Sequence, residues 1–224
     1  MMHREHTKPA DIERTSMSII QQELESRNIV LPEETAAVVK RVIHTTADFE
    51  YAENLRFTDH AVQRGVEAMG RKPVIVTDTN MARSGVSKPT LAKLDGQVLC
   101  FMAEESIAAE AKAQGTTRAA VSMEQALREH PGAVLAVGNA PTALLRIAEL
   151  MEQGARPSLV IGVPVGFVNV VESKEILLET CRKYGVPAIV ALGRKGGSNV
   201  AAAICNALLY TAANALDPTA RGWQ

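Results

Sequence analysis

The sequence predicts an α/β domain with a mainly parallel, five-stranded sheet, helices on both faces of the sheet and a helical N-terminal part. Two observations predict this class. Of the 224 residues, 46% are hydrophobic but only 4% are aromatic, which suits a parallel sheet packed against alanine-rich helices better than a β-sandwich. From residue 73 onward, short apolar runs alternate with helical stretches, and this alternation is typical of βαβ units.

The first third of the chain is predicted to be helical. Apolar residues indicate three helices, which cover about residues 9–27, 32–44 and 59–69. The second helix opens with Pro32, Glu33 and Glu34. This order favours a helix start, because proline suits a first turn and carboxylates stabilise the positive end of the helix dipole.

Five continuous apolar runs indicate strands that are buried on both faces. They cover residues 74–76, 98–101, 133–137, 159–163 and 188–192. The helices expected between and after them cover residues 104–114, 123–129, 142–153, 173–184 and about 198–216. We therefore expect a single domain over residues 1–224, with a helical part at about 9–70 and a βα-alternating core at about 73–216. The end of the chain, from residue 217, is expected to fray.

Charge and cysteine content limit the expected partners. The formal net charge is −1, so no global field attracts nucleic acid or a membrane surface. No uncharged apolar stretch approaches the roughly 18 residues of a membrane span. The scattered Cys100, Cys181 and Cys205 lack C-x-x-C spacing and indicate buried thiols in a reducing compartment. Since the N-terminus also lacks a signal-peptide pattern, we expect a cytoplasmic protein.

The second predicted helix carries the candidate catalytic residue. At about 100° per residue, Lys40, Arg41 and His44 fall on the face opposite its apolar residues. Histidine titrates near neutral pH, and two fixed cations beside it suit an acidic ligand that must be protonated. The alternative interpretation is a solvated helix face without function.

Other kinds of catalytic chemistry find no support in the sequence. The remaining histidines lack the spacing of a metal site; they are His3, His6, His60 and His130. The chain has no G-x-S-x-G elbow and no cysteine in an activating context. General acid–base catalysis by His44 is the chemistry that remains.

Candidate ligand contacts lie where the predicted strands end, because ligands of open α/β sheets bind beyond the carboxyl ends of the strands. They are Asp78, Met81, Arg83, Asn139, Thr142, Gly166 and Arg194. Two of them have structural alternatives. Asn139 precedes Pro141 and is typical of a helix cap, and Asp78 suits a turn or cap as well as it suits a ligand contact.

Residues 193–198, Gly-Arg-Lys-Gly-Gly-Ser, invite a phosphate-loop interpretation. Their order does not match G-x-x-x-x-G-K-[ST], and the chain also lacks G-x-G-x-x-G. A weaker inference remains: backbone N–H groups at a helix start, beside Arg194 and Lys195, favour an anion, either a carboxylate or a phosphate. A nucleotide-binding protein is therefore one alternative function.

Several motifs, in the same order, resemble those of the precorrin-8X methylmutase family. They are residues 41–44 (RVIH), 137–144 (VGNAPTAL), 164–168 (PVGFV) with 172–174 (ESK), and 185–187 (GVP) followed by 193–198 (GRKGGS). The resemblance covers about residues 12–209, which is nearly the whole chain.

The resemblance implies a flavodoxin-like, three-layer α/β/α fold and a homodimer. It implies an isomerase of cobalamin biosynthesis that moves a ring methyl group from C11 to C12 of a corrinoid tetrapyrrole, precorrin-8 or cobalt-precorrin-8, with no dissociable cofactor. In the family a histidine handles the proton, and here it matches His44; substrate contacts match Arg41 and Ser16. A corrinoid carrier without catalysis is the alternative.

Overall fold

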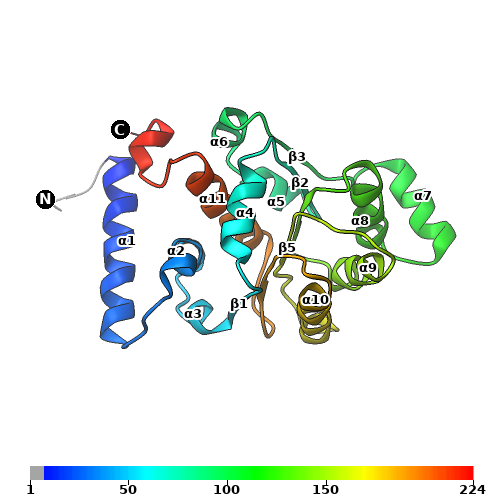
Figure 1. Ribbon diagram of the computed structural model, residues 1–224, viewed down its shortest axis with the longest axis horizontal. Helices are drawn as coiled ribbons and strands as arrows, with labels where there is room; N and C mark the ends of the chain where they lie inside the picture. The colour runs from blue at the N-terminus through cyan, green and yellow to red at the C-terminus, as the bar shows by residue number, and fades with distance from the viewer. Residues whose placement is uncertain (1–7, 224) are drawn as a thin grey trace, which may run out of the picture.

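The computed structural model describes residues 8–223 and contains one six-stranded sheet between two layers of helices (Figure 1). The strand order is β1-β6-β5-β4-β2-β3. The strands are β1 (Leu55–Phe57), β2 (Val74–Thr77), β3 (Gln97–Leu99), β4 (Val134–Val137), β5 (Leu159–Gly162) and β6 (Ala188–Ala191). Strands β2 to β6 pair in parallel and coincide with the five predicted strands, so the predicted α/β core is confirmed.

The predicted strand count is one too low. Strand β1 has three residues and pairs antiparallel with β6 at the edge of the sheet. A segment this short shows no readable alternation of apolar and polar residues, which explains why the sequence pattern misses it. Numbered along the chain from β2, the five parallel strands have the order 2-1-3-4-5, the flavodoxin-like order that the resemblance implies.

Successive residues of the central strands face opposite hydrophobic clusters, so the sheet is buried on both faces. Ile75 and Val134 belong to one cluster, and their neighbours Val76 and Leu135 belong to the other. The first cluster is covered by α2 (Glu33–Thr46), α4 (Ala61–Met69), α5 (Asn80–Gly85), α6 (Lys88–Lys93) and α11 (Ser198–Ala212). The second is covered by α7 (Glu105–Gln114), α8 (Arg118–Glu129), α9 (Pro141–Glu152) and α10 (Val170–Tyr184).

The N-terminal helix lies outside the three layers formed by the sheet and its covering helices. Helix α1 (Pro9–Ser26) packs on α2 and on the C-terminal turn η1 (Pro218–Arg221), and it lies at one end of the molecule (Figure 1). Three short helices were not predicted: α3 (Tyr51–Asn54), α5 and α6. None exceeds six residues, which is too short for a clear apolar periodicity.

The expectation of a frayed C-terminus is wrong for residues 217–223. Asp217 caps η1 by accepting a hydrogen bond from the Thr219 N–H at 2.8 Å, and Arg14 pairs with the Asp217 carboxylate at 2.9 Å. The Arg221 side chain is only 5% exposed. Arg14 lies 203 residues from Asp217 in the sequence, so the local pattern could not reveal this ion pair.

The structure also bears on the expectations about cysteines, membrane spans and histidines. Cys181 and Cys205 are buried and Cys100 is half-buried, and all three are free thiols. Over residues 8–223, no helix combines the length and the apolar character needed to cross a membrane. His3 and His6 lie outside the described residues.

Candidate active site

His44 lies in the last turns of α2 and is bonded to α1. Its Nδ1 is 2.8 Å from Ser16 Oγ, so the structure brings two of the predicted site residues together. The hydroxyl can donate to a neutral ring or accept from the protonated ring. Because Nδ1 is engaged by Ser16, Nε2 is the ring nitrogen left to face a ligand.

A pocket of about 400 Å³ opens beside this pair. Its walls are α1, the end of α2 and the loop that follows α2. The lining is mostly apolar and includes Ile12, Ile19 and Phe49 together with Ser16 and His44. Ile12 and Ile19 are large apolar side chains left half-exposed on α1. The pocket therefore places one titratable ring nitrogen against an apolar surface, an arrangement that suits a proton transfer to a flat, hydrophobic ligand.

The pKa of His44 is held below its ordinary value of 6.5. Burial is the largest cause, since it disfavours the charged ring. The positive charges of Arg41 and Arg221 act in the same direction, and the carboxylate of Glu13 opposes them. At neutral pH the ring is therefore predominantly neutral in the free protein.

Arg41 occupies a different position from the one the sequence suggests. Its guanidinium donates to Glu13 Oε1 at 2.7 Å and lies 5.3 Å from the ring of Tyr210. Glu13 is 4% exposed, so this ion pair is buried between α1 and α2. Lys40 lines a separate hollow with residues of α1 and the loop before α2, and therefore the three cations do not form one ligand-binding face.

Asp78 is a structural residue in this geometry. It is 1% exposed, and its carboxylate accepts the N–H groups of Gly138, Asn139 and Ala140 at 2.8–2.9 Å. Burial raises the pKa of Asp78, and the three hydrogen bonds oppose this rise. The capping alternative thus describes its position, and a direct ligand contact does not fit its burial.

The exits of β5 and β6 form one platform. Gly166 N–H donates to the Arg194 carbonyl at 3.2 Å, and Gly197 N–H donates to the Val163 carbonyl at 2.8 Å. The Arg194 guanidinium lies 5.5 Å from the exposed ring of Phe167. Two predicted contacts, Gly166 and Arg194, are therefore neighbours on this platform.

A buried lysine binds the backbone of the β6 exit in this platform. Lys174 is fully buried and donates to the carbonyls of Gly193 and Lys195 at 2.7 and 2.9 Å. Burial lowers its pKa to about 8. Apart from the family motif, nothing in the sequence predicts a role for Lys174, because a lysine on a predicted helix is normally a solvated residue.

The other predicted contacts are spread over the exits of β2 and β4. Met81 and Asn139 are exposed. Arg83 Nε donates to the Val98 carbonyl at 3.3 Å, and the Thr142 hydroxyl is 2.7 Å from that of Thr117. These residues share the carboxyl edge of the sheet with the platform, but they do not line the His44 pocket.

An ion-pair cluster joins the platform to the His44 pocket. Lys195, from the exit of β6, binds Asp48 at 2.6 Å and Glu50 at 2.9 Å. Asp48 lies between Ala47 and Phe49, which both line the pocket. The pocket and the carboxyl edge of the sheet are therefore adjacent.

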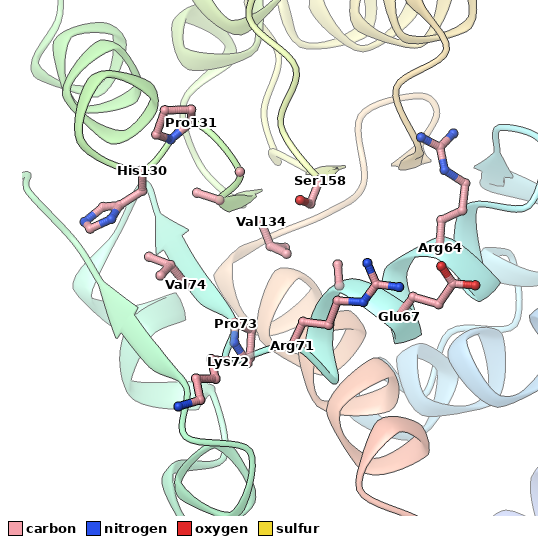
Figure 2. A pocket seen from close by; sticks show the side chains of 13 residues that line it. Arg64, Glu67, Arg71, Lys72, Pro73, Val74, His130, Pro131, Val134 and Ser158 are labelled. Carbon is pink, nitrogen blue, oxygen red and sulfur yellow. The ribbon is translucent and has the colours of Figure 1, made fainter.

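A second hollow, of about 430 Å³, lies at the opposite edge of the sheet (Figure 2). Its walls are the end of α4, the first residues of β2 and the turn before β4, and it includes Arg64, Arg71 and His130. None of the predicted site residues lines it. The amino ends of parallel strands are not the usual ligand edge of such a sheet, and the candidate site is therefore the His44 pocket with the adjoining platform.

Comparison with known proteins identifies the family. The model of the family described as precorrin-8X methylmutase matches residues 11–211. The chain belongs to the precorrin-8X methylmutase family. Its reaction class is an isomerisation in cobalamin biosynthesis, which confirms the resemblance drawn from the motifs.

Curated relatives and a solved structure agree with this assignment. The cobalt-precorrin-8 methylmutase of Priestia megaterium is 41% identical over 90% of this chain and 87% of its own. That of Salmonella typhimurium is 47% identical over 78% of this chain and 80% of its own. The crystal structure of a precorrin-8X methylmutase from Thermus thermophilus is 39% identical and has a TM-score of 0.81, covering 91% of this chain and 98% of that one.

Two residues that support the candidate site, Glu13 and Lys174, were assigned no role from the sequence. Glu13 occupies the same helix face as Ile20 and Leu24, which are buried, so a carboxylate on the apolar face of an amphipathic helix was the available signal. Lys174 belongs to the family motif of residues 172–174, which was its only signal. Among residues 8–223, no three His, Cys, Asp or Glu side chains gather as a metal site would require; the absence of a cofactor stays a prediction.

We expect His44 to titrate below pH 6.5 in the free protein. Burial and the charge of Arg41 both disfavour its imidazolium form. The measurement is a pH titration of the histidine ring signals by NMR, with the His44 signal assigned from its absence in His44→Gln. A midpoint above 6.5 would contradict this electrostatic description of the pocket.

Proposed function

We propose that this chain catalyses the migration of a methyl group from C11 to C12 of precorrin-8 or cobalt-precorrin-8, with His44 as the proton-transfer residue. The observation that carries the proposal is the Ser16–His44 pair at the mouth of an apolar pocket in a chain of the methylmutase family. The reaction is an isomerisation and has no net redox change, so we expect no dissociable cofactor. Any cobalt belongs to the substrate.

His44 has two tasks in this mechanism. Its Nε2 delivers a proton to the conjugated ring system, which withdraws electron density along it. The bond from the methyl group to C11 then breaks, the bond to C12 forms, and the proton returns to Nε2. The Ser16 hydroxyl accepts from the Nδ1–H throughout and fixes the orientation of the ring. A positioned general acid–base group of this kind typically contributes ~10²–10⁴-fold to the rate.

Binding of the substrate changes the protonation of His44 in the required direction. The ring is predominantly neutral in the free protein because its pKa is lowered. The substrate is edged with carboxylates, and each negative charge near the ring favours the imidazolium form. The acid needed for the first step is therefore produced mainly in the complex.

The size of the pocket indicates how the substrate lies. Ligand pockets are typically ~300–1,000 Å³, and a volume of about 400 Å³ admits only one edge of a four-ring macrocycle. The rest of the ring extends toward the platform, where Gly166 allows close approach. Arg194 and Arg83 are the cations available there for substrate carboxylates, through charge-assisted hydrogen bonds. Met81, Asn139 and Thr142 are further candidate contacts on the same edge.

Two alternative functions receive less support. A corrinoid carrier would need the same binding surface but would not need an oriented histidine. A nucleotide-binding protein would place a phosphate at the exits of β2 and β4, where the Asp78 carboxylate already accepts the backbone N–H groups. Both observations favour the methylmutase. We also expect the enzyme to act in the cytoplasm.

We expect His44→Gln to lower the single-turnover rate by about 10²–10⁴-fold, because glutamine keeps much of the polarity but cannot transfer the proton. The conversion of purified precorrin-8 or cobalt-precorrin-8 is followed by its absorbance change. Thr45→Ala is the matched control, since Thr45 is the next residue and is exposed.

The same experiment separates the enzyme from the carrier. Product binding should survive in His44→Gln, because the carboxylate contacts are unchanged. An unimpaired rate in His44→Gln would contradict the assignment of His44. A wild-type protein that binds the product but never converts the substrate would support the carrier.

We expect Arg194→Met to raise KM about tenfold and to leave kcat nearly unchanged. A lost hydrogen bond to a charged group costs ~1.5–3 kcal/mol, about tenfold in affinity at the lower limit, and exposure of Arg194 favours that limit. Arg128→Met is the control, because it removes an equal charge in the last turn of α8, at the opposite edge of the sheet. Equal KM values for both variants would exclude Arg194 from substrate binding.

We further propose that the protein is a homodimer, as the resemblance implies. The β5 exit carries Val165, Phe167 and Val168 as large exposed apolar side chains, which is typical of a protein surface covered by a partner. Light scattering after size-exclusion chromatography should give twice the chain mass of 24.0 kDa. A mass of one chain at micromolar concentration would overturn this proposal.

A further inference from the structure

The last turn of the chain is docked against the helix that forms one wall of the His44 pocket. Helix α1 packs on α2 and on η1, and in Figure 1 it lies at the end of the molecule, beside the C-terminus. Residues of α1 provide more than half of the pocket lining. The position of α1 therefore sets the shape of the pocket, and η1 is one of the elements that hold it.

The contact between η1 and α1 is a buried pair of charges. Arg221 and Arg41 both donate to Oε1 of Glu13, at 2.5 and 2.7 Å. The side chains of Glu13 and Arg221 are each 5% exposed, and that of Arg41 is 11% exposed. Exposed ion pairs contribute little to structure, but one buried carboxylate shared by two arginines fixes the relative positions of α1, α2 and η1.

Aromatic rings enclose Arg221. Its guanidinium lies 4.2 Å from the ring of Tyr210 on α11 and 5.1 Å from the ring of Trp223. Its Nε and Nη1 are buried without a hydrogen-bond partner among the described residues. Buried N–H groups without a partner are unfavourable for stability, so the contacts that hold Arg221 in place are its ion pair with Glu13 and the two aromatic rings.

Two contacts between α1 and α2 lie one helical turn apart. Glu13 and Ser16 are i,i+3 neighbours on α1, and Arg41 and His44 are i,i+3 neighbours on α2. Glu13 binds Arg41, and Ser16 binds His44. A displacement of α1 at Glu13 must therefore also displace the Ser16 hydroxyl that orients His44.

We propose that Arg221 is a positioning residue of the methylmutase reaction: by binding Glu13, the C-terminal turn holds α1 where Ser16 orients His44. This inference rests on the function proposed above. Arg221 lies beyond residues 11–211, the part of the chain that the family model matches. The last turn of the chain thus completes the pocket without touching the substrate.

Removal of Arg221 also changes the charge around His44. The surrounding charged groups are Glu13 and Glu23 of α1, Arg41 of α2, Arg221 of η1, and the Asp48–Lys195 pair beside the loop after α2. Arg221 lowers the pKa of His44 and Glu13 raises it. Without Arg221, the pKa of His44 should move upward because a positive charge is lost, and the dependence of the rate on Ser16 is the readout that tests positioning.

The test compares Ser16→Ala, Arg221→Ala and the double variant under single-turnover conditions at a temperature at which circular dichroism shows each variant folded. Misplacement of a catalytic group by about 1 Å can cost ~10²-fold, and we expect a loss of about 10- to 100-fold for Arg221→Ala. Because Arg221 acts through Ser16, Arg221→Ala should cost little more in the Ser16→Ala background. Arg221→Lys should recover part of the rate, since it retains a cation for Glu13.

Two spectroscopic readouts and one control complete the design. NMR should show a higher His44 pKa in Arg221→Ala, and the emission of Trp223, the only tryptophan, should change because its cationic neighbour is lost. Arg14→Gln is the matched control: it breaks the exposed tie between α1 and Asp217, and we expect a rate close to that of the wild type.

The outcomes separate the two proposals. A wild-type protein that does not convert the substrate overturns the proposed function itself. Wild-type conversion, with an unchanged rate in Arg221→Ala or with equal losses in both backgrounds, overturns only the role of Arg221. If Arg221→Ala does not fold, Arg221→Gln decides, because it removes the charge and keeps most of the side chain. A reduced rate that is seen only with Ser16 present, together with a raised His44 pKa, supports the proposal, and a wild-type rate overturns it.

Discussion

Burial of the parallel sheet on both faces is the constraint on which the rest of this structure depends. Because the strands end inside the protein, the backbone groups at their exits need partners within the chain. At the exits of β2 and β4 that partner is the Asp78 carboxylate, and at the exit of β6 it is the Lys174 ammonium. One buried charge of each sign thus closes the loops at the carboxyl edge.

These internal charges explain why the candidate site differs from the ligand site of nucleotide-binding proteins with the same fold. In a flavodoxin-like sheet the ligand commonly binds at the switch point between the first and third parallel strands, which here are β2 and β4. The N–H groups that would hold a phosphate there are already bonded to Asp78. The candidate site lies farther out, between the platform and the added helix α1.

The sequence predicted the core because the core follows from local patterns. Each of the five parallel strands is an uninterrupted apolar run, and the longer helices repeat apolar residues at helical spacing. The short elements β1, α3, α5 and α6 contain too few residues to show a period. Their positions depend on tertiary contacts, such as the pairing of β1 with β6.

For the site, local spacing and motif resemblance identified His44, Ser16 and Arg41 as candidates. They did not predict how these side chains are arranged. Arg41 was expected to meet the ligand, which stays a prediction, and the structure shows it bound to Glu13 rather than free. That difference arises because Glu13 is buried, and a buried carboxylate requires an opposite charge. Glu13 contacts Arg41, which is 28 residues away in the sequence, and Arg221, which is 208 residues away. The apolar periodicity of a single helix gives no sign of such distant contacts.

The charge balance at Glu13 connects the stability of the outer helices to the chemistry of the pocket. Two arginines and one carboxylate leave one net positive charge close to His44, and burial adds to its effect on the pKa of the ring. A ring held neutral in this way stays largely unprotonated at neutral pH in the free protein. In the proposed mechanism, a polyanionic substrate offsets the positive charge and supplies part of the electrostatic change that makes His44 an acid. Protonation of His44 would then occur mainly in the complex, and the charges that delay it belong to residues that hold α1 in place rather than to residues that touch the substrate.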